Sequence, residues 1–159
     1  MKIYYLQQEQ LVHVDIARAW DFFSSAENLS VITPPELGFK IFTDVSGKDI
    51  YEGMIIEYKV SPLFGIPLHW KTEIAKVDRP HSFMDRQLKG PYRLWEHTHV
   101  FIEKENGTLV KDTVKYSLPF GLFGQLINAV IVRYKLRHIF SYRKQILDQI
   151  FKSHGKNTD

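Results

Sequence analysis

The chain has 159 residues, of which 44% are hydrophobic, and it carries a net charge of +3 with no cysteine. This length and apolar content predict one domain with its own core, residues 1–153, followed by a frayed tail, residues 154–159. The absence of cysteine excludes a thiolate nucleophile, a cysteine-based zinc site and a disulfide framework, and it fits a cytoplasmic protein. The small positive charge does not indicate nucleic-acid binding, and no apolar run is long enough to predict a membrane span.

The chain is predicted to begin with an edge strand and a short helix. Residues 2–14 alternate loosely between apolar and polar side chains, as an edge strand does. Asp15 is a suitable N-cap for a helix over residues 16–25, whose apolar side carries Trp20 and Phe23. One further turn is expected over residues 28–33, and the proline pair that follows ends it.

Four strands are predicted next, over residues 39–45, 54–60, 68–77 and 82–88. In the second and third, alternation gives an inner face made of Met54, Ile56, Tyr58, Val60, Leu68, Trp70, Thr72 and Ile74. The loop over residues 62–67 is rich in proline, glycine and large apolar side chains, which is typical of a loop that closes over an interior. Periodicity leaves the fourth strand open: its inner residues are either Phe83, Asp85 and Gln87, or Met84, Arg86 and Leu88.

Two alternating runs flank Asn106-Gly107, the strongest hairpin signal in the chain. A type I′ turn closed by Glu105 and Thr108 predicts a register in which four pairs lie opposite one another: Phe101 and Asp112, His99 and Val114, His97 and Tyr116, Trp95 and Leu118. One face of the hairpin then carries Trp95, His97, His99, Phe101, Val110, Asp112, Val114, Tyr116 and Leu118. The opposite face, with Thr98 and Lys115, is typical of a solvated surface.

The first hairpin face is apolar and aromatic, yet it includes imidazoles, a carboxylate and a phenol, which is typical of a cavity wall with polar groups. Trp95 and Tyr116 can stack on a flat ligand or simply fill a core. A metal on His97 and His99 would need a third ligand, for which Asp112 is the candidate; no further closely spaced ligand is evident, and we predict no metal and no cofactor.

Residues 122–152 have the periodicity of one long helix. Its sheet-facing stripe is predicted to be Ala129, Val132, Leu136, Ile139, Phe140, Arg143, Ile146, Leu147 and Ile150. The first half has a second apolar face, made of Leu126, Ile127, Val130, Ile131 and Tyr134. That face needs a partner, which the sequence leaves open as a loop of the same domain, a ligand, a second copy in a homodimer or a peripheral membrane contact. Arg133, at the edge of the stripe, is expected to point inward to Asp85 or an acidic ligand head rather than to snorkel to solvent.

Six or seven consecutive strands between a short helix and a long one predict an α+β fold, with a curved antiparallel sheet wrapped around the C-terminal helix. No phosphate-binding glycine pattern and no nucleophile elbow occurs.

The order of elements, with the segments GPYRLWEHTHVF and DTVKYSLPFG, resembles the START-like or Bet v 1-like (SRPBCC) superfamily, in particular its bacterial polyketide cyclase/dehydrase and lipid-transport group. The resemblance covers essentially the whole chain. Asp85 and Gln87 match an acidic residue and a glutamine before the family's Gly-Pro, which favours the orientation that points both inward. Trp95, His97 and His99 match its W-x-H-x-H portion. The resemblance implies a seven-stranded helix-grip fold with a hydrophobic tunnel, and it implies no shared catalytic residue.

We therefore predict a protein that binds a hydrophobic small molecule, such as a lipid, an isoprenoid or an aromatic polyketide, in an internal tunnel gated by residues 62–67 and 119–124. The predicted contact residues are Tyr58, Trp70, Asp85, Gln87, Trp95, His97, His99, Asp112, Tyr116 and Arg133. One alternative is a cyclase or dehydratase that uses His97 or His99 as acid/base, with Asp112 as a further candidate. The other is a protein- or membrane-interaction module that uses the second apolar face of the helix.

Overall fold

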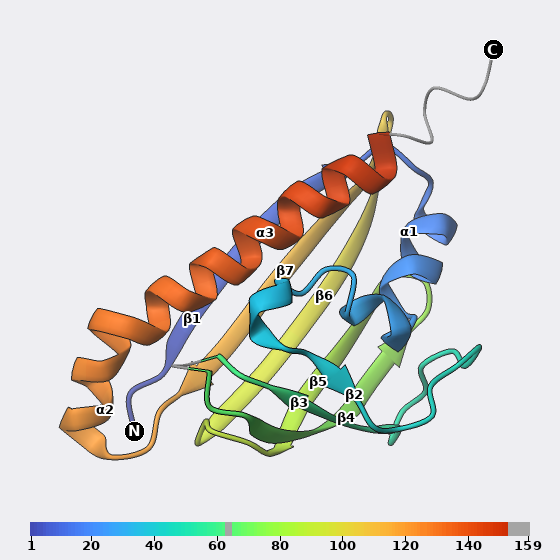
Figure 1. The fold of residues 1–159 in the computed structure, drawn as a ribbon. Helices are drawn as coiled ribbons and strands as arrows, with labels where there is room; N and C mark the ends of the chain where they lie inside the picture. Colours follow the sequence, from blue (N-terminus) through green and yellow to red (C-terminus); the bar gives the residue numbers. More distant parts are fainter. Residues whose placement is uncertain (63–64, 153–159) are drawn as a thin grey trace.

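The computed structural model describes residues 1–62 and 65–152, and the statements below concern these residues. Within them seven antiparallel strands form one sheet in the order β1-β7-β6-β5-β4-β3-β2, and a long C-terminal helix lies along one of its faces (Figure 1). The strands are β1 (Tyr4–Val12), β2 (Lys40–Ile41), β3 (Ile55–Val60), β4 (Leu68–Asp78), β5 (Ser82–Lys89), β6 (Leu94–Lys104) and β7 (Gly107–Ser117). The predicted α+β helix-grip architecture is confirmed, with β1 at an edge.

Helix α1 (Ile16–Phe23) begins where the sequence predicts, because the Asp15 carboxylate accepts a hydrogen bond of 2.8 Å from the backbone N–H of Arg18. Two short 3₁₀ turns follow, Ala26–Leu29 and Pro35–Leu37. The predicted strand over residues 39–45 is wrong in extent, since only β2 pairs with β3 there. The segment before β2, residues 26–39, forms a cover that lies over the sheet in Figure 1.

The β6–β7 hairpin has the predicted faces but a register shifted by two residues. Phe101 lies opposite Val110, His99 opposite Asp112, His97 opposite Val114 and Trp95 opposite Tyr116. The predicted type I′ turn required φ > 0 at Asn106, whereas the positive φ is at Gly107 (142°), and the turn therefore centres on Glu105-Asn106. A shift of two keeps every side chain on its predicted face.

Strand β5 takes the orientation in which Phe83 and Asp85 face the interior. Phe83 is buried, and Asp85 pairs in register with His97 of β6. The inner faces predicted for β3 and β4 are confirmed by the burial of Ile56, Trp70 and Ile74.

The C-terminal helical segment runs from Gly121 to Lys152, but it is not one regular α-helix. Helix α2 (Gly121–Ile127) is followed by a π-helical turn (Asn128–Val132) and then by α3 (Arg133–Lys152). The wider turn changes the side-chain phase, because a π-turn uses more residues per turn than an α-helix. As a result Asn128 is buried and Ala129 is exposed, and the prediction that Ala129 faces the sheet is wrong. From Val132 onward the predicted stripe is buried or half-buried.

The apolar core is divided into clusters with a space between them. The first joins α1, the sheet and the C-terminal end of α3, and includes Trp20, Phe23, Phe101, Leu147 and Phe151. The second packs the N-terminal part of the long helix on β7, through Val114, Tyr116, Val132, Leu136 and Phe140. The third consists of Leu37, Val60 and Trp70. No helix in this described part of the chain is long and apolar enough to cross a bilayer.

Candidate functional site

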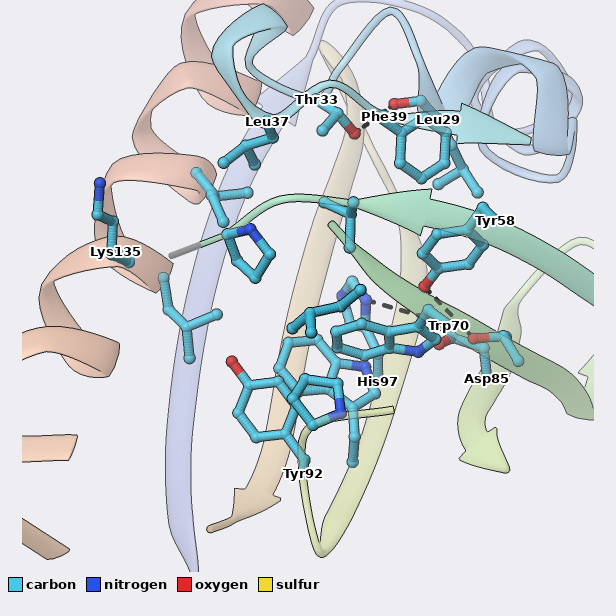
Figure 2. Close-up of a pocket in the computed structure, with 18 of the residues that line it drawn as sticks. Leu29, Thr33, Leu37, Phe39, Tyr58, Trp70, Asp85, Tyr92, His97 and Lys135 are labelled. Carbon is cyan, nitrogen blue, oxygen red and sulfur yellow. Dashed lines mark hydrogen bonds and ion pairs between the residues drawn. The ribbon is translucent and has the colours of Figure 1, made fainter. Parts of the chain in front are cut away.

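A cavity of about 330 Å³ lies among the three clusters. Its walls come from the inner face of the sheet, from the long helix and from the cover of residues 26–39. Figure 2 places Leu37 and Phe39 of the cover opposite Tyr58 and Trp70 of the sheet. The volume and the mainly apolar, aromatic lining are typical of a small-molecule site.

Six predicted contact residues line the cavity: Tyr58, Trp70, Asp85, Trp95, His97 and His99. The aromatic members form one continuous wall, because the Trp70 ring contacts those of Tyr58, Tyr92 and Trp95 at centroid distances of 5.9, 5.5 and 5.3 Å. Of the predicted gates, Pro62, Pro119, Phe120 and Gly124 also line it. Leu63 and Phe64, in the first gate, fall outside the described residues.

Four other predicted contact residues do not line the cavity. The Gln87 side-chain amide donates to the backbone carbonyl of Tyr92 at 2.7 Å, which holds the connection between β5 and β6. The Tyr116 hydroxyl donates to Asn128 Oδ1 at 2.9 Å, and Asp112 lies behind the two histidines. The inward placement of Arg133 is wrong, because its side chain is exposed. Arg133 lies about 100° around the helix from the buried Val132, which turns its side chain out of the sheet-facing stripe.

The polar part of the cavity wall is a buried cluster of two histidines between two aspartates. Asp112 Oδ1 lies 3.2 Å from His97 Nε2, in a hydrogen bond, and 2.7 Å from His99 Nδ1, in a contact bent away from hydrogen-bond geometry. On the cavity side, Asp85 Oδ2 lies 3.7 Å from both His97 Nδ1 and His99 Nε2. Each imidazole therefore has one nitrogen toward Asp112 and the other toward Asp85.

The electrostatics of this cluster separate the two histidines. Burial lowers the pKa of His97, and the neighbouring His99 lowers it further. Burial also acts to lower the pKa of His99, but Asp112 and Asp85 outweigh it and the pKa is raised. Burial alone would raise the pKa of Asp112, whereas His99 and His97 hold that pKa well below its usual range. Asp112 is therefore held in its ionised form beside the two imidazoles.

Arg143 is a cavity residue that the sequence reasoning did not assign to the site. It is buried, it lines the cavity, and its guanidinium lies 4.8 Å from the centroid of the Phe140 ring. Its Nε and Nη1 have no hydrogen-bond acceptor in the described protein, nor has Nε1 of Trp70. Arg143 was on the predicted sheet-facing stripe, and a charged residue on an otherwise apolar stripe was the signal that could have identified it.

Comparison with known proteins identifies the fold class. No protein-family model matches the chain, and the search of curated proteins found no relative. Among solved structures, a Thermus thermophilus protein is similar with a TM-score of 0.69 and 18% identity, over 95% of this chain and 99% of that chain. Ginseng major latex-like protein 151 from Panax ginseng is similar with a TM-score of 0.67 and 13% identity, over 94% of this chain and 97% of that chain.

Norcoclaurine synthase from Thalictrum flavum, in complex with dopamine and hydroxybenzaldehyde, is similar with a TM-score of 0.64 and 15% identity, over 93% of this chain and 88% of that chain. These similarities extend over nearly the whole chain and concern the fold. The chain therefore shares the helix-grip fold of these structures, which is the fold that the resemblance to the Bet v 1-like superfamily predicted.

Proposed function

We propose that the protein binds a mainly hydrophobic small molecule, of the size of a lipid, an isoprenoid or an aromatic polyketide, with an oxygen-bearing polar end inside the cavity. The observation that carries this proposal is the combination of an aromatic wall with buried donors that have no acceptor. Arg143 Nε and Nη1 and Trp70 Nε1 all belong to cavity-lining residues. Because unpaired buried donors are costly, a ligand carboxylate or carbonyl that accepts from them would stabilise the complex.

The test combines native mass spectrometry with titration of three probes: dodecanoic acid, farnesol and an anthraquinone. We expect one probe molecule per chain and a change in tryptophan fluorescence, since Trp70 and Trp95 line the cavity. Leu136→Trp should fill the cavity and weaken probe binding at least tenfold. Tyr134→Trp introduces the same indole at an exposed position of the same helix and should leave binding unchanged. Absence of 1:1 binding to every probe, with no copurified ligand, would contradict the proposal.

A cyclase or dehydratase activity is a second candidate, favoured by the opposite pKa shifts of His97 and His99. His97, whose pKa is lowered by burial and by His99, is the candidate base, and His99, whose pKa is raised by the two aspartates, is the candidate acid. His97→Gln and His99→Gln separate the two functions. Loss of turnover of a polyketide substrate in these variants, with retained probe binding, supports catalysis. Absence of turnover in the unmodified protein supports binding without catalysis.

A third candidate function is a peripheral membrane contact. The patch made of Phe120, Leu122, Phe123, Leu126, Val130 and Tyr134 is more than 60% exposed at every position. The exposed basic residues Arg133, Lys135 and Arg137 lie beside its C-terminal end on the helix, which favours an anionic lipid surface. Phe120 both belongs to this patch and lines the cavity, so the patch reaches the cavity mouth.

Cosedimentation with phosphatidylcholine vesicles, with and without phosphatidylserine, tests the membrane contact. We expect binding that increases with phosphatidylserine and falls in Phe123→Ser/Leu126→Ser. Val31→Ser removes an exposed apolar side chain on the cover and serves as the control. A dimer by light scattering that the double variant dissociates would instead assign the patch to a second copy of the chain.

A further inference from the structure

Asp85, His97 and His99 bring three ligand atoms together on the cavity wall. One atom from each side chain lies within 4.8 Å of the other two, and Asp85 Oδ2 is 3.7 Å from both His97 Nδ1 and His99 Nε2. The backbone fixes this arrangement, because Asp85 of β5 pairs directly with His97 of β6, and His99 follows two residues later on the same face. Both strands lie in the middle of the sheet.

The separations fit metal ligands better than hydrogen-bonded partners. A distance of 3.7 Å is too long for a hydrogen bond between nitrogen and oxygen. Two ligands bonded to one zinc ion at about 2.0–2.1 Å lie roughly 3.3 Å apart in a tetrahedral site. The three ligand atoms, all within 4.8 Å of one another, would have to draw closer by side-chain rotation to bind one ion.

Asp112 occupies the position of an outer-shell carboxylate. Its Oδ1 contacts His97 Nε2 at 3.2 Å and His99 Nδ1 at 2.7 Å, on the side away from Asp85. Metal-binding histidines typically direct their second ring nitrogen to such a carboxylate, which orients the ring and fixes its tautomer. With protons on the nitrogens facing Asp112, the remaining nitrogens present lone pairs toward Asp85.

We propose that Asp85, His97 and His99 bind a divalent first-row transition metal ion, with Asp112 orienting the two imidazoles and the open coordination positions facing the cavity. Two imidazoles and one carboxylate suit Zn²⁺, Fe²⁺ or Co²⁺ rather than Ca²⁺ or Mg²⁺, which prefer oxygen ligands. The carboxylates of Asp85 and Asp112 together balance the charge of a divalent ion. An oxygen atom of a cavity ligand can fill an open position, and this metal site goes beyond the proposed binding function.

The experiment is titration of chelator-treated protein with Zn²⁺ by calorimetry and with Co²⁺ by visible absorption. We expect one ion per chain, a Kd of about 1 μM or tighter, and d–d bands of a low-coordinate nitrogen/oxygen site. Asp85→Asn and His99→Gln should each weaken binding at least tenfold. Asp112→Asn should weaken it by about 10–100-fold, the usual effect of losing an outer-shell partner. His69→Gln, at an exposed histidine paired with Glu57, is the control and should bind as the wild type does.

The proposal is overturned by absence of saturable 1:1 binding in the wild-type protein, or by binding that survives both Asp85→Asn and His99→Gln. Circular dichroism checks that each variant is folded. Should a variant not fold, the wild type supplies a second readout: histidine ring signals of His97 and His99 must shift or broaden with one equivalent of Co²⁺ while those of His69 do not. Probe binding by metal-free protein is measured separately, so that the proposed metal site and the proposed ligand binding are tested independently of each other.

Discussion

At the scale of single residues, Arg143 buries a guanidinium that has two nitrogen atoms without an acceptor. We predict that Arg143→Met leaves the ligand-free protein as stable or more stable, because an apolar side chain of similar volume removes the desolvation cost of the charge. The same change should weaken dodecanoic acid binding at least tenfold and its methyl ester much less. Calorimetry and thermal unfolding measure both effects, with exposed Arg137→Met as control. Equal losses for acid and ester would contradict a role in binding the carboxylate.

Tyr92 lies on the cavity wall, where burial raises its pKa above the ordinary value. A tyrosine with a raised folded-state pKa binds its proton more tightly in the native state. Its contribution to stability is therefore full below the unfolded pKa of about 10 and is lost as the pH rises toward the folded pKa. We expect the melting temperature to fall between pH 9 and 11, and to fall less steeply in Tyr92→Phe. Absorbance at 295 nm should show tyrosines that ionise only on unfolding; full ionisation of the folded protein by pH 11 would contradict this.

At the scale of elements, the hairpin tip is held against the end of β1 by Gly107. A Cβ at this residue would lie 2.1 Å from the carbonyl oxygen of Val12, and φ is 142°. The nearest atoms, the carbonyl oxygen of Val12 and Cα of His13, belong to the backbone and cannot easily move aside. Gly107→Ala should therefore destabilise the protein by about 2–4 kcal/mol in urea unfolding. Gly47→Ala is the matched control, because Gly47 also has a positive φ but open space around it, and we expect about 1–2 kcal/mol there. Similar losses at the two positions would show that φ alone sets the cost.

The π-turn is tied to β7 by the hydrogen bond between the Tyr116 hydroxyl and Asn128 Oδ1, both buried. We expect Asn128→Ala to cost about 1–3 kcal/mol, because it leaves the hydroxyl unsatisfied. Tyr116→Phe and the double variant complete a double-mutant cycle, in which the coupling energy between Tyr116 and Asn128 should be about 0.5–3 kcal/mol. A coupling near zero would indicate that packing, rather than this bond, places the π-turn.

These elements also show what the sequence could and could not determine. Alternation of period two assigned His97, His99 and Tyr116 to the inner face, and it does so whichever turn closes the hairpin. The register depended on the dihedral angles of Asn106 and Gly107, which composition does not report. Likewise, helical periodicity placed the residues after the π-turn correctly. It misplaced Ala129, which lies within the π-turn, because a change of helix type is not visible in the periodicity.

At the scale of the whole molecule, the cavity couples ligand binding to stability. The three apolar clusters pack the two ends and one side of the sheet, and each contributes residues to the cavity wall. A ligand that fills this space adds contacts to all three at once. Binding should therefore stabilise the cover of residues 26–39 together with the long helix, rather than one element alone.

Because a ligand of the folded state shifts the unfolding equilibrium by mass action, a probe at 100 times its Kd should stabilise the protein by about 2.7 kcal/mol. For a domain of about this size, 1 kcal/mol corresponds to roughly 2–4 °C, so we expect the melting temperature to rise by about 5–11 °C. Differential scanning calorimetry measures the shift, and hydrogen exchange should slow in residues 26–39. In Leu136→Trp, which occupies the cavity with its own side chain, both effects should disappear. An equal shift in that variant would mean that the probe binds elsewhere on the molecule.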